Sequence, residues 1–385
     1  MIGNGSSAIQ IVPSMQKLPG VDLKVFMRGR TWIAFSFGES MMSKLELDHL
    51  TFTDDDKKKF HDDEKYYNFR KIIESDVNSV HNISLRGSAF AEGARQMFTD
   101  LMNTRLKKRP ELADFLIPKF SVGCRRLTPG PGFLESLCED NVESIMTPIK
   151  KITPKGVELA DGKHVDLDVL VCATGFNPCA IPFPVHGIGN VNLQDRFEPY
   201  PDAYLSLAVD KFPNFMLMLG PNSGVGSGSL TKILETIGDY IIKTIRKIQK
   251  EDIKAMHIKT ARMKDWSAHV DAYFPRTVYL DDCKSWYRSD LGHGTRIVGL
   301  WPGSTLHAIE ALRSPRWEDY EYDYDEPADD PLTANRLQWL GNGWSELQLK
   351  EGGDMSYYIE DAYVDFPSAP LPERTPKWSH VSFSY

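Results

Sequence analysis

The opening eight residues, Met-Ile-Gly-Asn-Gly-Ser-Ser-Ala, constrain the fold of this chain more than any other stretch. Two glycines separated by one residue, then two further residues and a small residue, form the turn that joins a strand to a helix in many parallel sheets. In that turn Gly3 permits a tight bend, Gly5 lets a pyrophosphate approach the backbone, and Ala8 lets the helix pack closely on the sheet. The pattern favours an α/β fold, with a purely structural turn as the alternative.

The residues after the turn supply the expected context. A helical pattern runs from about Ser6 to Leu18, and a strand-like run follows from Leu23 to Met27. The first amides of the helix and its dipole then face the phosphates of a bound dinucleotide. The candidate cofactor-binding residues of this turn are Gly3, Asn4, Gly5, Ser6, Ser7 and Ala8.

The end of the predicted second strand indicates which dinucleotide fits. A site for NAD normally carries an aspartate or glutamate there, which holds the ribose hydroxyl groups. This chain instead has Arg28 and Gly29, followed by Arg30. Because a guanidinium group suits the additional 2′-phosphate of NADP, we predict an NADP(H) site that includes Arg28 and Gly29. The alternative is that both arginines are ordinary surface residues.

Composition narrows the class of protein. The 385 residues are 41% hydrophobic and 25% charged, which is ordinary for a globular protein. The net charge of −8 argues against nucleic acid or an anionic membrane as the partner, and no apolar run reaches the ~18 residues that span a bilayer. The five cysteines are scattered without a CxxC pair. We expect a reduced, cytoplasmic chain without a disulfide scaffold or a metal site.

The remaining patterns divide the chain into segments. Residues 41–119 are polar and helical in period, which predicts a helical insertion whose run of Asp and Lys is solvated. Residues 1–40 and 120–175 flank it and form the Rossmann-like domain, with short strands separated by Pro-Lys-Gly and Asp-Gly turns. A C-terminal lobe follows over residues 176–320. The acidic tail, residues 321–385, carries many aromatic residues, so we expect it to pack on the body.

Two apolar runs and one long helix define the expected core. Asp168 to Cys172 and Phe215 to Leu219 are typical of buried parallel strands. The second run leads into a Gly/Ser-rich stretch and then into the most regular helical pattern of the chain. The expected buried face of that helix consists of Leu230, Ile233, Leu234, Ile237, Ile241, Ile245 and Ile248.

Several longer motifs are specific as a set. In chain order they are "GNGSSAIQIVP", "VFMRGRTWI", "VGCRRLTPGPGFLESL", "VLVCATGFN", "LGPNSGVGSGSL", "CKSWYR", "LWPGS" and "PRWEDYEYDY". Together they resemble the fungal branch of the flavin-dependent class B monooxygenases, the Baeyer–Villiger type. In that family one Rossmann fold binds FAD, and a second one, inserted into it, binds NADPH. The opening turn resembles the second, and Met1 and Ile2 are too few to form its feeding strand. We therefore expect the chain to be the NADPH half and the C-terminal, FAD-contacting lobe of a larger enzyme.

The resemblance also implies roles for individual residues. Arg126 is similar to the catalytic arginine that stabilises the oxygenated flavin and the negatively charged intermediate formed from it, a role that needs a permanent cation. Arg125 corresponds to a basic residue near the nicotinamide phosphate. Thr174 and Gly175 are similar to the turn that connects the two nucleotide domains, and Asn222 to the loop that reaches the flavin. Structural roles remain the alternatives for these residues, and Trp301 is either a pocket residue or a core residue.

The function implied by the resemblance is an FAD- and NADPH-dependent monooxygenase of secondary metabolism. It inserts one oxygen atom of O₂ beside the carbonyl of a hydrophobic ketone, which gives an ester or a lactone, and oxygenation of nitrogen or sulfur is a variant. Two alternatives remain at this point. The chain is a non-redox protein that binds or rearranges a metabolite on the same scaffold, or it is a non-functional fragment.

Overall fold

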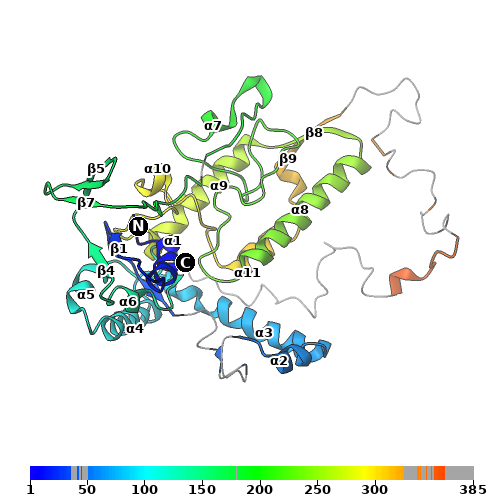
Figure 1. Cartoon of the computed structure of the whole chain (residues 1–385). Coiled ribbons are helices and arrows are strands. Elements are labelled where there is room, and N and C mark those ends of the chain that lie inside the picture. Colours follow the sequence, from blue (N-terminus) through cyan, green and yellow to red (C-terminus); the bar gives the residue numbers. More distant parts are fainter. Residues whose placement is uncertain are drawn as a thin grey trace.

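The chain alternates helices and short strands, so the predicted α/β class is confirmed (Figure 1). A computed structural model describes residues 1–35, 41, 42, 45, 51–178, 180–324, 336, 337, 339, 344, 348 and 351–359. The elements of the N-terminal part are α1 (Ser6–Gln16), β1 (Leu23–Phe26), β2 (Ile33–Ala34), α2 (Asp54–Lys59), α3 (Asp63–Ser79), η2 (Val80–Ser84), α4 (Ala89–Arg105), α5 (Pro110–Leu116), β3 (Thr128–Pro129), α6 (Phe133–Ser136), β4 (Val142–Ile145), β5 (Ile149–Thr153), β6 (Gly156–Leu159) and β7 (His164–Asp166).

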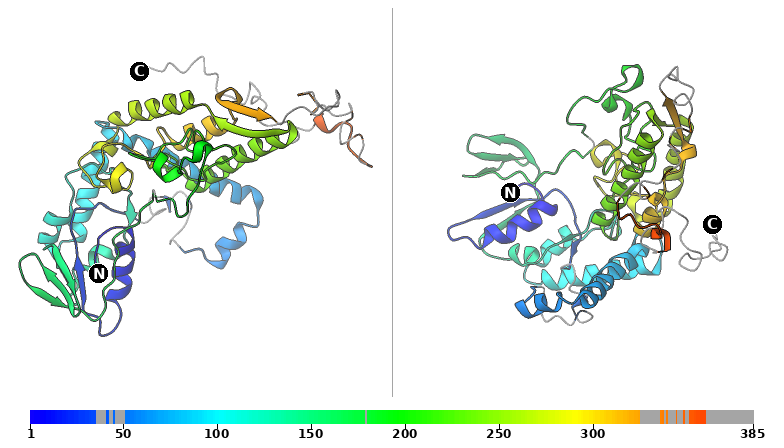
Figure 2. Two further views of the ribbon diagram at one scale, coloured as in Figure 1. Left: turned by 90° about the horizontal axis from the view of Figure 1, so that it is seen from above. Right: turned by 90° about the vertical axis from the view of Figure 1, so that its right-hand side faces the viewer.

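The elements of the C-terminal part are mostly helical. They are η3 (Ile188–Asn190), α7 (Leu193–Arg196), α8 (Leu230–Lys250), β8 (Ile253–Ile258), α9 (Thr260–Tyr273), η4 (Phe274–Arg276), η5 (Val278–Leu280), α10 (Ser289–Gly292), α11 (Thr305–Leu312), η6 (Trp317–Asp319), β9 (Tyr320–Tyr324) and η8 (Tyr357–Ile359). Figures 1 and 2 show that the N-terminal strands gather at one end of the molecule and α8, α9 and α11 at the other.

Parallel pairing organises the N-terminal end. Ile2 forms parallel bridges to Phe26 on one side and to Cys172 on the other, β1 pairs with β4, and β2 pairs with β3, all in parallel. Helix α1 packs on these strands through Ala8 and Ile9, which are 0% and 2% exposed. The helix and strand predicted after the opening turn are therefore confirmed. The antiparallel sheet of β5, β6 and β7 lies at the outer edge of this end (Figure 1).

Helices α2 to α5 occupy most of the segment in which we predicted a helical insertion. The Asp and Lys side chains of α2 pair with one another at the surface, and no residue of α3 is buried. Helix α4 joins the N-terminal core through Phe98 and Met102. Residues 36–40 and most of 43–50 lie outside the described part of the chain.

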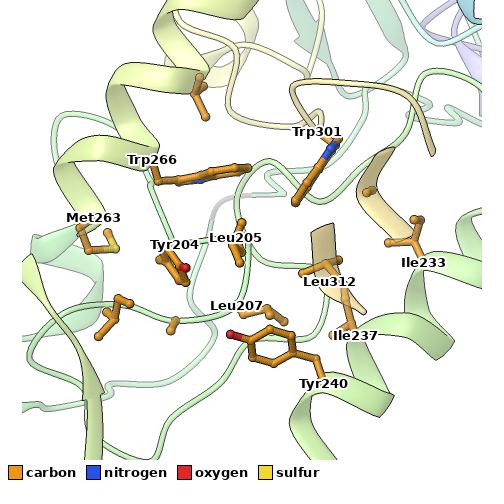
Figure 3. Close-up of a cluster of buried hydrophobic side chains, with 14 of the residues drawn as sticks. Tyr204, Leu205, Leu207, Ile233, Ile237, Tyr240, Met263, Trp266, Trp301 and Leu312 are labelled. Carbon is orange, nitrogen blue, oxygen red and sulfur yellow. The ribbon is translucent and has the colours of Figure 1, made fainter. Parts of the chain in front are cut away.

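A second core forms between α8, α9, α11 and the β8–β9 pair, and Figure 3 shows part of it. Helix α8 is present as predicted, but its buried face is shifted. Ile233 and Ile237 are buried as expected, whereas Ile245 is 47% exposed and Tyr240 is fully buried. The helix can turn Tyr240 inward because its hydroxyl bonds to that of Tyr320 at 2.9 Å, which satisfies this polar group inside the core.

The tail begins as a strand of this second core. Strand β9 pairs antiparallel with β8, so that Tyr320 lies opposite Ile258, and the Tyr320 side chain is only 3% exposed. Most of the later tail, including most of the stretches "NRLQWLGNGW" and "MSYYIEDAYVDF", lies outside the described residues.

The two predicted buried strands are wrong. Asp168 to Cys172 forms only one isolated bridge, and Val169 is 73% exposed because no described element covers that side. Phe215 to Leu219 is irregular, with a single antiparallel bridge from Met216 to Ala208. An apolar run becomes buried only where another strand or helix covers it. The local sequence of the run does not tell whether such an element lies beside it in the fold.

The expectation of unpaired cysteines is also wrong. Cys124 and Cys283 form a disulfide across 159 residues of sequence. Spacing gave no hint of it because the two residues meet only when the two ends of the molecule pack together. Cys138 and Cys172 are free, and Cys179 lies outside the described residues. In the described part of the chain, no helix is both long and apolar enough to cross a membrane.

Candidate functional site

The opening turn packs directly against the residues that follow Cys172. Gly3 has a φ of 118°, and a Cβ atom added to it would lie 2.4 Å from the Ala173 carbonyl oxygen. The Ala173 amide in turn donates to the Ile2 carbonyl at 2.9 Å. Only glycine suits this position, because both the backbone angle and the close approach exclude a side chain. Thr174 and Gly175 are thereby held, exposed, beside the turn.

The second glycine of the turn is open. Gly5 is the N-cap residue of α1 and has an extended backbone, and a Cβ added there would meet nothing within 4 Å. The helix has no side-chain cap, so its first amides are available to a ligand. Ser7 is exposed beside them, while the Ser6 hydroxyl lies 2.6 Å from the Thr128 hydroxyl.

The loop after β1 lies next to this turn. The buried Asn4 side chain donates to the Gly29 carbonyl at 2.5 Å, which ties the loop to the turn. Arg30 donates to the Asp114 and Ile117 carbonyls at 2.7 Å each and thus caps the C-terminal end of α5. Arg28 is exposed, and among the described residues it has no ion-pair partner. The two arginines therefore differ, because Arg30 has a structural role and Arg28 is available to an anion.

The adjacent arginines of the "GCRR" motif point in different directions. Arg125 donates to the Arg30 carbonyl at 3.0 Å, and burial lowers the pKa of its guanidinium group. Arg126 is exposed and lies close to the hydroxyl of Tyr287, from the C-terminal part. Burial raises the pKa of Tyr287 to about 12, an effect that the charge of Arg126 opposes. The motif thus contacts both ends of the molecule.

Asn222 and Trp301 belong to a different region. The Asn222 amide is 2% exposed and donates to the carbonyls of Ile297 and Leu300 at 2.9 and 3.0 Å. Its side chain therefore holds a neighbouring loop and is not presented to a ligand. Trp301 is 3% exposed and packs against Trp266 with ring centroids 5.0 Å apart (Figure 3). Of the two alternatives for Trp301, the structure favours a core residue.

The structure thus brings together most of the predicted cofactor residues. The opening turn, the Arg28–Gly29 loop and the Thr174–Gly175 turn each follow a segment that pairs in parallel, and the carboxyl ends of parallel strands are where open α/β sheets bind ligands. Arg125 precedes β3 and reaches this region through its hydrogen bond to the Arg30 carbonyl. Sequence reasoning missed Tyr287 and the disulfide beside Arg126. The motif "CKSWYR" contains both Cys283 and Tyr287 and was the available signal. The described residues contain no cluster of three His, Cys, Asp or Glu side chains suited to a metal ion.

The fold defines a class of protein. The structure is similar to that of OTEMO in complex with FAD and NADP, a Baeyer–Villiger monooxygenase, with a TM-score of 0.68 at 19% identity. The match covers 84% of this chain and 66% of that one. This similarity establishes the fold of the FAD- and NADP-binding monooxygenases.

Sequence relatives agree with the fold. The chain is 33% identical over 362 residues to the FAD-binding monooxygenase tazF of Aspergillus terreus, covering 93% of this chain and 63% of the relative. It is 32% identical over 352 residues to the FAD-binding monooxygenase moxY of Dothistroma septosporum, covering 91% and 54%. The chain thus spans little more than half of the length of these relatives. No family model matches it. The resemblance to fungal flavin-dependent monooxygenases is confirmed.

Proposed function

We propose that this chain binds NADP(H) at the opening turn and supplies the NADPH-binding part of an FAD-dependent monooxygenase. One observation carries the proposal. An open glycine at an uncapped helix N-terminus lies beside an exposed arginine whose charge no described residue neutralises. This combination suits a dinucleotide with an additional phosphate group.

Each residue has a distinct role in this proposal. Gly5 leaves room for the pyrophosphate, and the amides of Ser6 and Ser7 donate to it from the start of α1. Arg28 binds the 2′-phosphate. Gly3 has no contact with the ligand and holds the turn against Ala173. Arg125, fixed by the Arg30 carbonyl, supplies positive charge beside the nicotinamide half of the cofactor.

The fit to FAD is weaker than the fit to NADP(H). The Asn222 side chain, which was expected to reach the flavin, is engaged with the carbonyls of Ile297 and Leu300. A bound flavin supplies the oxidation chemistry, since it accepts hydride and reacts with O₂. This chain contributes Arg126, whose permanent charge stabilises negative charge that develops on a substrate carbonyl. We propose a hydrophobic ketone as the substrate, secondary metabolism as the context and the cytoplasm as the location.

Two binding measurements on the purified chain test the proposal. Calorimetric titration with NADP⁺ and NAD⁺ should give tighter binding of NADP⁺, and Arg28→Ala should remove the preference. A visible absorbance spectrum recorded after incubation with FAD and gel filtration should show retained flavin, which NADPH then bleaches. Equal, negligible binding of both nucleotides would refute the NADP(H) site. A colourless protein would refute the monooxygenase assignment for this chain and favour a non-redox role.

A further inference from the structure

Two segments far apart in sequence meet beside the paired arginines. Cys124 and Cys283 form a disulfide, and the Ser121 amide donates to the Asp281 carboxylate at 3.0 Å. The same carboxylate pairs with Arg86 at 3.2 Å. The segment that ends in Arg126 is therefore joined to the 281–288 segment by the disulfide and by the hydrogen bond from Ser121 to the Asp281 carboxylate.

The joined segments belong to different cores. Val122, two residues before Cys124, is buried in the N-terminal core, whereas Tyr287, four residues after Cys283, is buried in the C-terminal core. Arg125 follows Cys124 directly and donates to the Arg30 carbonyl in the loop after β1, and the next residue, Arg126, contacts Tyr287. The disulfide thus joins the two cores at the residue that directly precedes both arginines.

We propose that the Cys124–Cys283 disulfide is a reducible clamp that sets the positions of Arg125 and Arg126 at the junction of the two cores. The functional consequence rests on the proposed NADP(H) site, to which Arg125 contributes. In the oxidised protein the 121–126 segment is held at both of its ends. Reduction leaves non-covalent contacts, among them those of Ser121 with Asp281 and of Arg126 with Tyr287, so the arginines sample more positions and NADP⁺ binds less tightly.

The chemistry of the clamp is ordinary thiol–disulfide exchange with a dithiol reductant. One thiolate of the dithiol attacks a cystine sulfur, the other cysteine leaves as a thiolate, and the second thiol of the reductant resolves the mixed disulfide. Two electrons and two protons pass to Cys124 and Cys283, and the dithiol becomes a cyclic disulfide. Cys124 is 0% exposed and Cys283 is 6% exposed, so exchange requires local opening and is slow. In the cytoplasmic location that we propose, disulfides are usually redox-sensing or catalytic, which agrees with this role.

The first test of the clamp does not depend on any cofactor. Alkylation of the unreduced, denatured chain followed by mass spectrometry should label Cys138 and Cys172 and leave Cys124 and Cys283 unlabelled. Reduction of the folded chain with dithiothreitol should then speed amide hydrogen exchange in residues 121–126 and 281–288. The double variant Cys124→Ser/Cys283→Ser should exchange at the reduced rate with or without the reductant. The control variant Cys138→Ser, which changes a free cysteine, should behave as wild type.

The second test measures the functional consequence. Reduction should weaken NADP⁺ binding roughly tenfold, about the effect of one charged hydrogen bond, and reoxidation should restore it. Labelling of Cys124 and Cys283 in the unreduced chain, or unchanged exchange in both segments, overturns the clamp whatever the NADP⁺ result. If exchange responds as expected but the oxidised chain fails to bind NADP⁺, the proposed function falls and the clamp stands. NADP⁺ binding that is insensitive to reduction overturns the positioning role.

Discussion

The two glycines of the opening turn should respond very differently to alanine. Gly3→Ala forces a side chain onto a backbone with a φ of 118°, which costs about 1–3 kcal/mol. The new Cβ also lies 2.4 Å from the Ala173 oxygen, so the strand must shift and weaken a backbone hydrogen bond worth about 1 kcal/mol. We expect the free energy of unfolding to fall by about 2–4 kcal/mol.

Gly5→Ala is the matched variant. Its φ of −88° suits alanine, and nothing lies within 4 Å of the added Cβ. The poorer N-cap costs up to about 1 kcal/mol, which the lower entropy of the unfolded chain offsets by about 0.4–1 kcal/mol. Stability should therefore change by less than about 1 kcal/mol. The added methyl group occupies the space left for the pyrophosphate, so NADP⁺ binding should weaken at least about tenfold.

Urea unfolding followed by circular dichroism measures the first effect, and calorimetric titration with NADP⁺ measures the second. We expect a crossed result, in which Gly3→Ala loses stability and Gly5→Ala loses affinity for NADP⁺. A Gly3→Ala variant as stable as wild type would refute the packing argument. A Gly5→Ala variant with wild-type affinity would refute the phosphate site, because its backbone and surroundings are otherwise undisturbed.

Three further predictions concern other parts of the molecule. Burial lowers the pKa of His307 from 6.5, and its Nδ1 accepts a hydrogen bond from Trp301 at 2.9 Å. The contribution of His307 to stability is therefore complete above pH 6.5 and is lost as the pH falls further. His307→Gln should reduce the slope of the urea midpoint against pH. Arg30→Ala should lower stability by about 1–2 kcal/mol without changing the preference for NADP⁺ over NAD⁺ in titrations, the opposite of Arg28→Ala. In urea unfolding, Ile237→Ala in α8 should lower the free energy of unfolding by about 2–4 kcal/mol. Ile245→Ala, at a position that is 47% exposed, should lower it by less than about 1 kcal/mol. Equal losses of stability in the two variants would contradict the observed buried face of the helix.

Sequence alone determined the features that depend on local backbone requirements and on specific motifs. The glycine turn, the helix after it and the strand that ends before Arg28 follow from the short-range pattern, because a tight turn at Gly3 admits no other residue type. The long motifs indicated the monooxygenase relatives.

The tertiary structure alone decided how side chains of the same type are used. Arg28 and Arg30 are residues of the same type, two positions apart in the same loop, but only Arg30 reaches the end of α5. Asn222 was expected at a ligand and instead holds the 297–300 loop. The pairing of Cys124 with Cys283 spans 159 residues. A local pattern reports the backbone conformation and the hydrophobicity of a segment, whereas partner choice depends on which distant segment packs against it, and only the folded chain determines that.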